Sequence, residues 1–180
     1  MKKRKNIITV AIDSPAAAGA GTQAKLISKN YNLFYLDTGK IYRYIGMLKL
    51  KNQKKFSYNL VKYKINNMKL SYLKNKSLLS NDVALSAAKI AKDKKIRLIV
   101  HKFQQKYAYN PPKRYNGSVL DGRDIITVQL KNAMFKFFIT ASIKVRAERR
   151  YMEYKSLNKK ITYKEVLKSL RIRDKSDKER

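Results

Sequence analysis

Residues 7–29, IITVAIDSPAAAGAGTQAKLISK, decide the fold. The stretch opens with an unbroken apolar, β-branched run at 7–12, which is typical of a parallel strand buried on both faces. A loop of small residues follows, and residues 22–29 then have the composition of a helix that Asn30 and Asn32 would close. A strand, a small-residue loop and a helix in this order indicate an α/β protein with a parallel sheet.

The loop from Ser14 to Thr22 lies on the frame of a phosphate-binding P-loop, GxxxxGK[ST]. Such a loop wraps phosphates with backbone N–H groups at a helix N-terminus, and small side chains let the backbone approach the anion. Two positions depart from the pattern, because Ser14 replaces the opening glycine and Ala20 replaces the lysine. An alanine-rich turn without a ligand is the alternative interpretation of this stretch.

The rest of the chain continues the alternation of strands and helices. Further strands are predicted at 33–36, 118–120 and 134–140. Helices are predicted after Gly39, at helical spacing through 81–107, from Ser142 to about Lys155, and after the capping box Thr162-x-x-Glu165, with short helical pieces and loops at 51–78. The pattern predicts a three-layer α/β fold, with one parallel sheet between helices, in a single domain spanning residues 1–180.

Composition excludes several classes of site. The 180 residues include no cysteine and one histidine, which excludes a disulfide framework, a cysteine-ligated zinc and a multi-histidine metal site. No apolar run reaches about 18 residues, so we expect a soluble cytoplasmic protein without a membrane span. The net charge of +31 is spread from end to end and is mostly lysine, so we expect nonspecific adhesion to nucleic acid at low salt but no specific nucleic-acid partner.

Five motifs carry a resemblance to a known family. They are AIDSPAAAGAGT (11–22), LDTGKIYR (36–43), LDGRD (120–124), RAERR (146–150) and RIRDKSDKER (171–180). In this order they resemble the bacterial cytidylate kinases, which usually read close to IDGPAGSGKST, LDTGAMYR, DGRD, RAxRR and RxxRDxxDxxR. The resemblance runs from about Ile8 to Arg180 with a gap in the middle. It implies a P-loop nucleoside-monophosphate kinase fold and magnesium-dependent transfer of the ATP γ-phosphoryl group to CMP or dCMP.

The resemblance also implies roles for individual residues. ATP would be bound by Arg149 and by the loop residues Ser14, Pro15, Ala16, Ala17, Ala18, Gly19, Ala20, Gly21 and Thr22. CMP would be bound by Thr38, Tyr42, Arg43, Arg123, Asp124, Arg173, Asp177 and Arg180. Within this set, Arg43 and Arg123 would grip the acceptor phosphate and Asp124 would contact the cytosine amino group. Magnesium would be held by Thr22 and Asp121.

The residue chemistry fits these roles, and three of the assignments have a plainer alternative. Guanidinium groups grip phosphates with paired hydrogen bonds, and a carboxylate at the end of a buried strand can hold magnesium. The plainer interpretations are a simple turn at Asp121-Gly122, a solvated helix residue at Arg43, and a surface ion-pair ladder along Arg173, Asp177 and Arg180.

Three departures from the family pattern bear on function. Because Ala20 removes the loop lysine, we predict that Lys40, at a position where the family has a small residue, supplies a catalytic charge beside Arg43, Arg123 and Asp121. The arginine on the cytosine side aligns near Leu79, so base selectivity would rest more heavily on Asp124. The monophosphate-binding insert, 44–79, is shortened.

A fourth departure concerns the C-terminal part of the chain. The lid-like segment 151–180 ends where the family continues with one more strand and helix. We therefore expect the strand at 134–140 to have an open apolar edge. We also expect the chain to be a fragment or to have lost its 3′ coding end, and to be poorly soluble or stable only as an oligomer.

Three hypotheses follow for function. The first is an active cytidylate kinase, and the second is a nucleoside-monophosphate kinase of altered base choice, such as a preference for UMP or dCMP. The third is a nucleotide-binding pseudokinase, for example an RNA- or ribosome-associated factor. Turnover of CMP separates the first from the third, and base competition separates the first two. The oligomeric state stays open.

Overall fold

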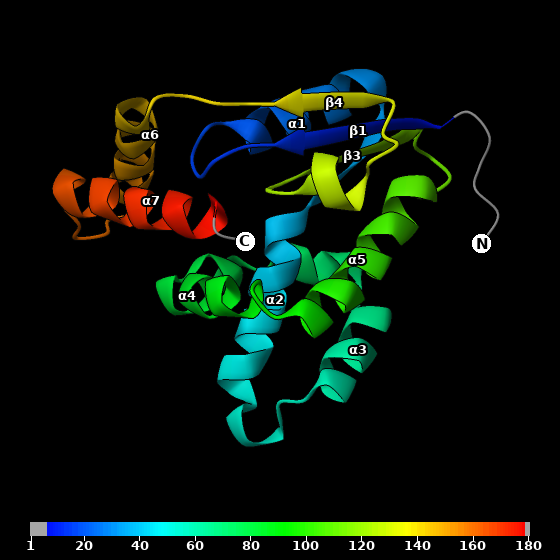
Figure 1. Cartoon of the computed structure of the whole chain (residues 1–180), viewed down its shortest axis with the longest axis horizontal. Helices are drawn as coiled ribbons and strands as arrows, with labels where there is room; N and C mark the ends of the chain where they lie inside the picture. Colours follow the sequence, from blue (N-terminus) through cyan, green and yellow to red (C-terminus); the bar gives the residue numbers. More distant parts are fainter. Residues whose placement is uncertain (1–6, 179–180) are drawn as a thin grey trace.

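The computed structural model describes residues 7–178 and contains one four-stranded parallel sheet (Figure 1). Its strands are β1 (Ile8–Asp13), β2 (Leu33–Asp37), β3 (Gly117–Gly122) and β4 (Phe135–Phe138). They lie in the order β2-β3-β1-β4, and every neighbouring pair is parallel. The four predicted strands and the parallel α/β class are confirmed.

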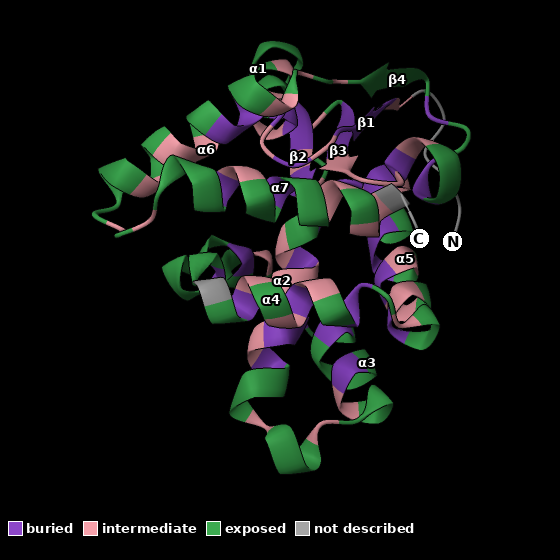
Figure 2. Ribbon diagram, turned by 60° about the vertical axis from the view of Figure 1, so that its left-hand side comes forward, coloured by how far each residue is buried: buried purple, intermediate pink, exposed green. Residues whose placement is uncertain are grey.

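Alternate side chains of the central strands point to opposite faces of the sheet, which produces three layers. On one face, Val10, Ile12 and Val119 pack with Ala24 of helix α1 (Ala20–Tyr31). On the other face, the cluster that contains Ala11, Phe34, Leu36 and Leu120 packs against the helices between β2 and β3. Figure 2 shows this buried interior on both sides of the sheet. As predicted, α1 ends at an asparagine, because Asn32 adopts the left-handed conformation that closes a helix.

All the regular elements between β2 and β3 are helices. Its α-helices are α2 (Thr38–Lys51), α3 (Tyr58–Asn66), α4 (Asn81–Ile90) and α5 (Lys94–Tyr109). Short 3₁₀ pieces, η1 (Gln53–Lys55), η2 (Leu70–Lys74) and η3 (Lys76–Leu79), connect them. The helical spacing through 81–107 is divided between two helices, because the Asp93 carboxylate accepts hydrogen bonds from the N–H groups of Lys95 and Ile96 and starts a new helix.

The chain after β3 contains a π-helical turn, η4 (Ile125–Gln129), which the sequence analysis did not predict. After β4 come α6 (Ile143–Ser156) and α7 (Tyr163–Lys178), which lie at one end of the sheet. Both predicted caps are confirmed: Ser142 accepts from the Val145 N–H, and the Thr162 and Glu165 side chains bond each other's backbone N–H. The boundary proposed at residue 151 falls inside α6.

Strand β4 is the exposed edge of the sheet beside β1. All four of its residues are exposed, with Phe135, Phe137 and Phe138 at 47%, 45% and 69% of their possible surface. The open apolar edge expected from the sequence is therefore present. No helix within residues 7–178 is long and apolar enough to span a membrane.

Candidate active site

The loop between β1 and α1 is shaped by its own small residues. Gly19 has φ of 101°, in the left-handed region, immediately before α1 begins. Ala17 also has a left-handed φ, 61°, which costs about 1–2 kcal/mol for a residue with a Cβ. Ala16 and Ala18 are buried. A strained but packed loop at a helix N-terminus is the backbone arrangement that binds phosphate.

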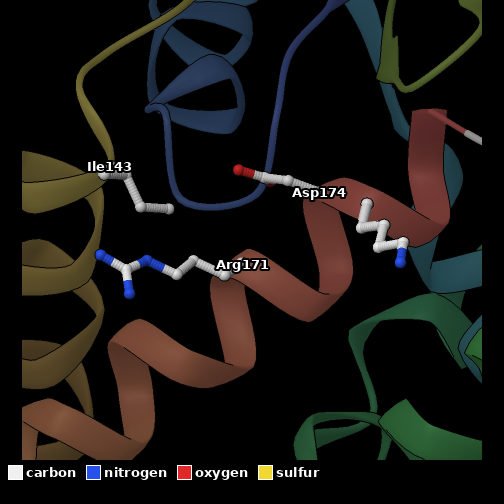
Figure 3. A pocket seen from close by; sticks show the side chains of 4 residues that line it. Ile143, Arg171 and Asp174 are labelled. Carbon is white, nitrogen blue, oxygen red and sulfur yellow. The ribbon is translucent and has the colours of Figure 1, made fainter.

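Two arginines of α6 hold this loop from outside. Arg146 is 5% exposed; its Nη1 donates to the Ala16 carbonyl at 3.1 Å, and its two Nη atoms grip the Asp174 carboxylate at 3.0 and 2.6 Å. Arg149 donates to the Ala18 carbonyl at 3.1 Å, so the predicted ATP-side arginine does contact the loop. Figure 3 shows Asp174 directed from α7 toward the loop. A shallow hollow of about 370 Å³ there is lined by Ile143, Arg171, Asp174 and Lys175.

Arg123 joins the loop to α7. Its Nη1 donates to the Ser14 carbonyl, and its Nε lies 3.1 Å from the Asp177 carboxylate. Asp177 also accepts from the Arg173 Nε at 3.2 Å, so these two residues share one face of α7 as their spacing predicts. Arg180 lies outside the described residues.

Asp121 is a partly buried acid at the end of β3, with one carboxylate oxygen fully enclosed. The register of the sheet sets Asp121 of β3 opposite Asp37 of β2. Burial and the negative charge of Asp37 raise the pKa of Asp121 to about 7, while a hydrogen bond from the Tyr35 hydroxyl acts in the opposite direction. Its Oδ1 is buried without a hydrogen-bond partner. An oxygen ligand left unsatisfied in this way fits a divalent cation.

The other predicted metal ligand, Thr22, lies at the start of α1, which faces Asp121. Thr22 is exposed in the first turn of α1, and a Cβ built on the preceding Gly21 would lie 3.6 Å from the Asp121 Oδ2. Among residues 7–178 no group of three or more His, Asp or Glu side chains is gathered for a metal. The oxygen atoms of Asp121 and Thr22 suit a magnesium ion, which would take its remaining ligands from phosphate and water.

The turn from β2 into α2 holds Thr38 and Lys40. Thr38 is buried and donates its hydroxyl to the Asp121 carbonyl at 2.7 Å, so this predicted CMP ligand ties α2 to β3. The Lys40 ammonium lies 4.0 Å from the Asp37 carboxylate. Since β3 separates β2 from β1, Lys40 lies on the far side of Asp121 from the phosphate loop.

Several guanidinium groups converge around Arg43. Arg43 donates to the Leu78 carbonyl at 2.8 Å. Burial lowers the pKa of Arg43, and the nearby positive charges of Arg150 and Arg173 lower it further, although Asp37 opposes them. Like charges held together at partly buried positions form a place where an anion is stabilised.

The guanidinium group beside the predicted base contact Asp124 comes from Arg97, which the sequence analysis did not name as a site residue. Leu79 is 52% exposed in η3, whereas Arg97 of α5 forms an ion pair with the predicted base contact Asp124. Burial lowers the pKa of Arg97, but the hydrogen bond and charge of Asp124, together with nearby Tyr42, raise it above its ordinary value. Arg97 was missed because the sequence analysis did not predict that a new helix, α5, begins at Lys94 and carries this residue toward Asp124. Its signal was present: Arg97 is the one arginine between Arg43 and Arg114 in a lysine-rich segment.

A parallel sheet with a small-residue loop between β1 and α1, a buried aspartate beside it and convergent arginines define a nucleotide-binding protein of the P-loop class. The profile of the cytidylate kinase family matches residues 10–180. The chain belongs to the cytidylate kinase family.

Individual relatives agree with this assignment. The cytidylate kinase of Clostridium botulinum strain Hall is 39% identical over 184 residues, covering 96% of this chain and 82% of the relative. That of Fusobacterium nucleatum is 39% identical over 179 residues, covering 93% and 79%. The crystal structure of an uncharacterized protein from Eubacterium ventriosum matches 94% of this chain and 73% of its own, with a TM-score of 0.50 at 18% identity, and supports the fold alone.

Proposed function

We propose that this chain transfers the γ-phosphoryl group of ATP to CMP or dCMP in the cytoplasm, giving CDP or dCDP. The observation that carries the proposal is the position of the partly buried Asp121, which lies beside the start of α1 on one side and beside Asp37, a neighbour of Arg43, on the other. Phosphoryl transfer asks a protein mainly to position two phosphates and to neutralise their charge. Membership of the cytidylate kinase family supports the same activity.

On the donor side, backbone N–H groups at the start of α1 would hold the ATP phosphates. Arg149 already lies against this loop and would add a positive charge beside Ala18 and Gly19. Lys40 lies beside Asp37. In place of the absent loop lysine, its ammonium would reach the phosphoryl group that is transferred. Its four-carbon stem allows the ammonium to turn from Asp37 toward the phosphates.

On the acceptor side, Arg43 and Arg123 would grip the monophosphate. Arg123 joins the loop to α7, so it would lie between the two substrates. Arg173 and Asp177 of α7 would take the ribose hydroxyls, with Arg180 at the phosphates. Asp124, paired with Arg97, would accept from the cytosine amino group, and Arg97 offers a donor for a base carbonyl.

Asp121 and Thr22 would hold magnesium with the ATP phosphates. The ion supplies charge neutralisation at the transferring group. Asp121 suits this role because a cation compensates the burial and the Asp37 charge that otherwise disfavour its ionised form.

A coupled assay with ATP, magnesium and a panel of CMP, dCMP, UMP and AMP tests the proposal. We expect turnover with CMP and dCMP above UMP and AMP, and loss of most of it in Arg43→Met. Arg114→Met is the matched control, because Arg114 is exposed and stacks on Tyr115 away from the site. Nucleotide binding without turnover would favour the pseudokinase, and a higher rate with UMP would favour altered base choice.

A further inference from the structure

Helix α5 presents a row of polar side chains to the π-helical turn η4. Arg97, His101 and Gln105 follow one another at four-residue spacing, so they lie along one face of the helix. Arg97 pairs with Asp124, His101 Nδ1 contacts the Gln129 Oε1, and Gln105 Nε2 donates to the Gln129 carbonyl at 3.4 Å. One helix face therefore holds both ends of the segment 124–129.

Gln129 connects this row to the backbone of Asp124. The Gln129 N–H donates to the Asp124 carbonyl at 3.1 Å, and the Val128 N–H donates to the same oxygen at 3.0 Å. A third bond, from the Leu130 N–H to the Ile125 carbonyl at 2.7 Å, completes a turn that is one residue wider than an α-helical turn. At its start, the Asp13 carboxylate accepts from the N–H groups of Ile125 and Ile126 at 2.7 and 3.0 Å. At its end, the support comes from α5.

The contact between the His101 Nδ1 and the Gln129 Oε1 can be a hydrogen bond only if the imidazole donates. An amide oxygen accepts and does not donate, so the imidazole must carry its hydrogen on Nδ1. Gln129 is 2% exposed, and removal of the imidazole would leave its buried oxygen without the donor on α5. A buried acceptor in that state drives the side chain to move, and its backbone moves with it.

We infer that His101 is a positioning residue for base selection, acting through Gln129 to fix the backbone that carries Asp124. The inference rests on the proposed function of Asp124 as the cytosine contact. It assigns a role in specificity to a side chain that belongs to none of the five motifs of the sequence analysis.

The test compares His101→Leu with His101→Asn. Leucine removes the donor, whereas the asparagine amide nitrogen occupies nearly the position of the histidine Nδ1. We expect His101→Leu to lower the ratio of kcat/KM for CMP over UMP about tenfold, mainly through a higher KM for CMP, with kcat within about threefold. His101→Asn should keep most of the ratio.

Three results would overturn the inference. One is a His101→Leu enzyme that melts lower but keeps the ratio, because His101 would then be structural only. Another is an equal loss in His101→Asn, because the hydrogen bond would not be the cause. The third comes from nitrogen NMR of the ligand-free protein at pH 8: the signal of its one histidine should show the Nδ1–H tautomer, and the Nε2–H tautomer would remove the contact.

The NMR measurement needs no turnover, so it decides the contact even if the proposed activity fails. An unmutated protein that does not phosphorylate CMP would overturn the proposed function. An active, selective enzyme whose ratio survives His101→Leu would overturn only the role of His101.

Discussion

The proposed donor and acceptor sides of the site differ in what they offer a ligand: one offers backbone groups and the other charged side chains. The donor loop, residues 14–22, has no charged side chain and offers backbone N–H groups, with its shape held by buried alanines and by Arg146 and Arg149. The proposed acceptor side is made of charged side chains, among them Arg43, Arg97 and Asp124. Backbone groups exist whatever the side chain, so a loop that binds through them accepts alanine at several positions. Reading a base and gripping a monophosphate require particular side chains.

The largest effect is expected at the boundary between the two sides. Asp121→Asn removes the buried carboxylate that fits magnesium, and we expect kcat to fall about 1000-fold, the scale of several kcal/mol of lost charge stabilisation. Steady-state assays with saturating ATP and CMP measure it, and EDTA should abolish the unmutated activity. An Asp121→Asn enzyme with near-normal kcat would show that Asp121 has no part in the reaction.

The next prediction tests whether Lys40 replaces the lysine that the loop lacks at position 20. Lys40→Met should lower kcat at least about 100-fold if Lys40 supplies the transition-state charge that Ala20 cannot. Lys51→Met is the control, because Lys51 is exposed at the far end of the same helix. Near-normal kcat in Lys40→Met would contradict the proposal and leave Arg149 as the cation of the donor side.

In the proposed function, base selection depends on the acceptor side alone. Asp124→Ala should lower the CMP-over-UMP ratio of kcat/KM by about 10-fold or more, because two opposed acceptors no longer penalise uracil. The exposed Asp82→Ala provides the control. Equal kcat/KM for CMP and UMP in the unmutated protein would show that Asp124 does not read the base.

The same buried acid predicts a stability effect that depends on pH. The pKa of Asp121, about 7 against an ordinary 3.8, means that the folded state binds the proton more tightly than the unfolded chain. The destabilisation is absent below about pH 4, grows as the pH rises, and is complete above about pH 7. Without metal or nucleotide, Asp121→Asn should therefore melt several degrees above the unmutated protein at pH 8, and the gap should close toward pH 4.5. Calorimetry in EDTA checks this; a gap independent of pH would contradict it.

The smallest effect tests the donor loop. Ala17→Gly relieves the strain of a left-handed φ in the folded state but raises the conformational entropy of the unfolded chain. Because the two effects oppose each other, we expect little change in Tm. Ala18→Gly gains no such relief and removes a buried methyl group, so its Tm should fall by about 3 °C. Equal shifts in the two variants would mean that Ala17 is not strained in solution.

The sequence predicted what local patterns determine. The strands, the Ser142 and Thr162 caps and the open edge at β4 follow from periodicity and from the chemistry of single residues. The sequence also brought together motifs far apart in the chain, since the ends of parallel strands meet at one edge of the sheet. That edge holds Asp37 and Asp121 as neighbours.

It could not predict contacts made by tertiary packing. The pairing of Arg97 with Asp124 depends on where Asp93 restarts the helix, and the π-helical turn depends on Asp13 and Gln129, which lie more than 100 residues apart. Similarly, the sequence around Thr38 does not show that its hydroxyl donates to the Asp121 carbonyl and not to a ligand. These features come from partners outside each residue's own element.

The bidentate grip of Arg146 on Asp174, with its third bond to the Ala16 carbonyl, has a consequence for the thermodynamics of nucleotide binding. A loop already tied to α6 and α7 has given up its conformational freedom during folding, before any nucleotide arrives. Ordering such a segment on binding would instead oppose association. Titration calorimetry of ATP should therefore show a less unfavourable entropy for this protein than for Arg146→Met, in which the loop must find its shape with the nucleotide.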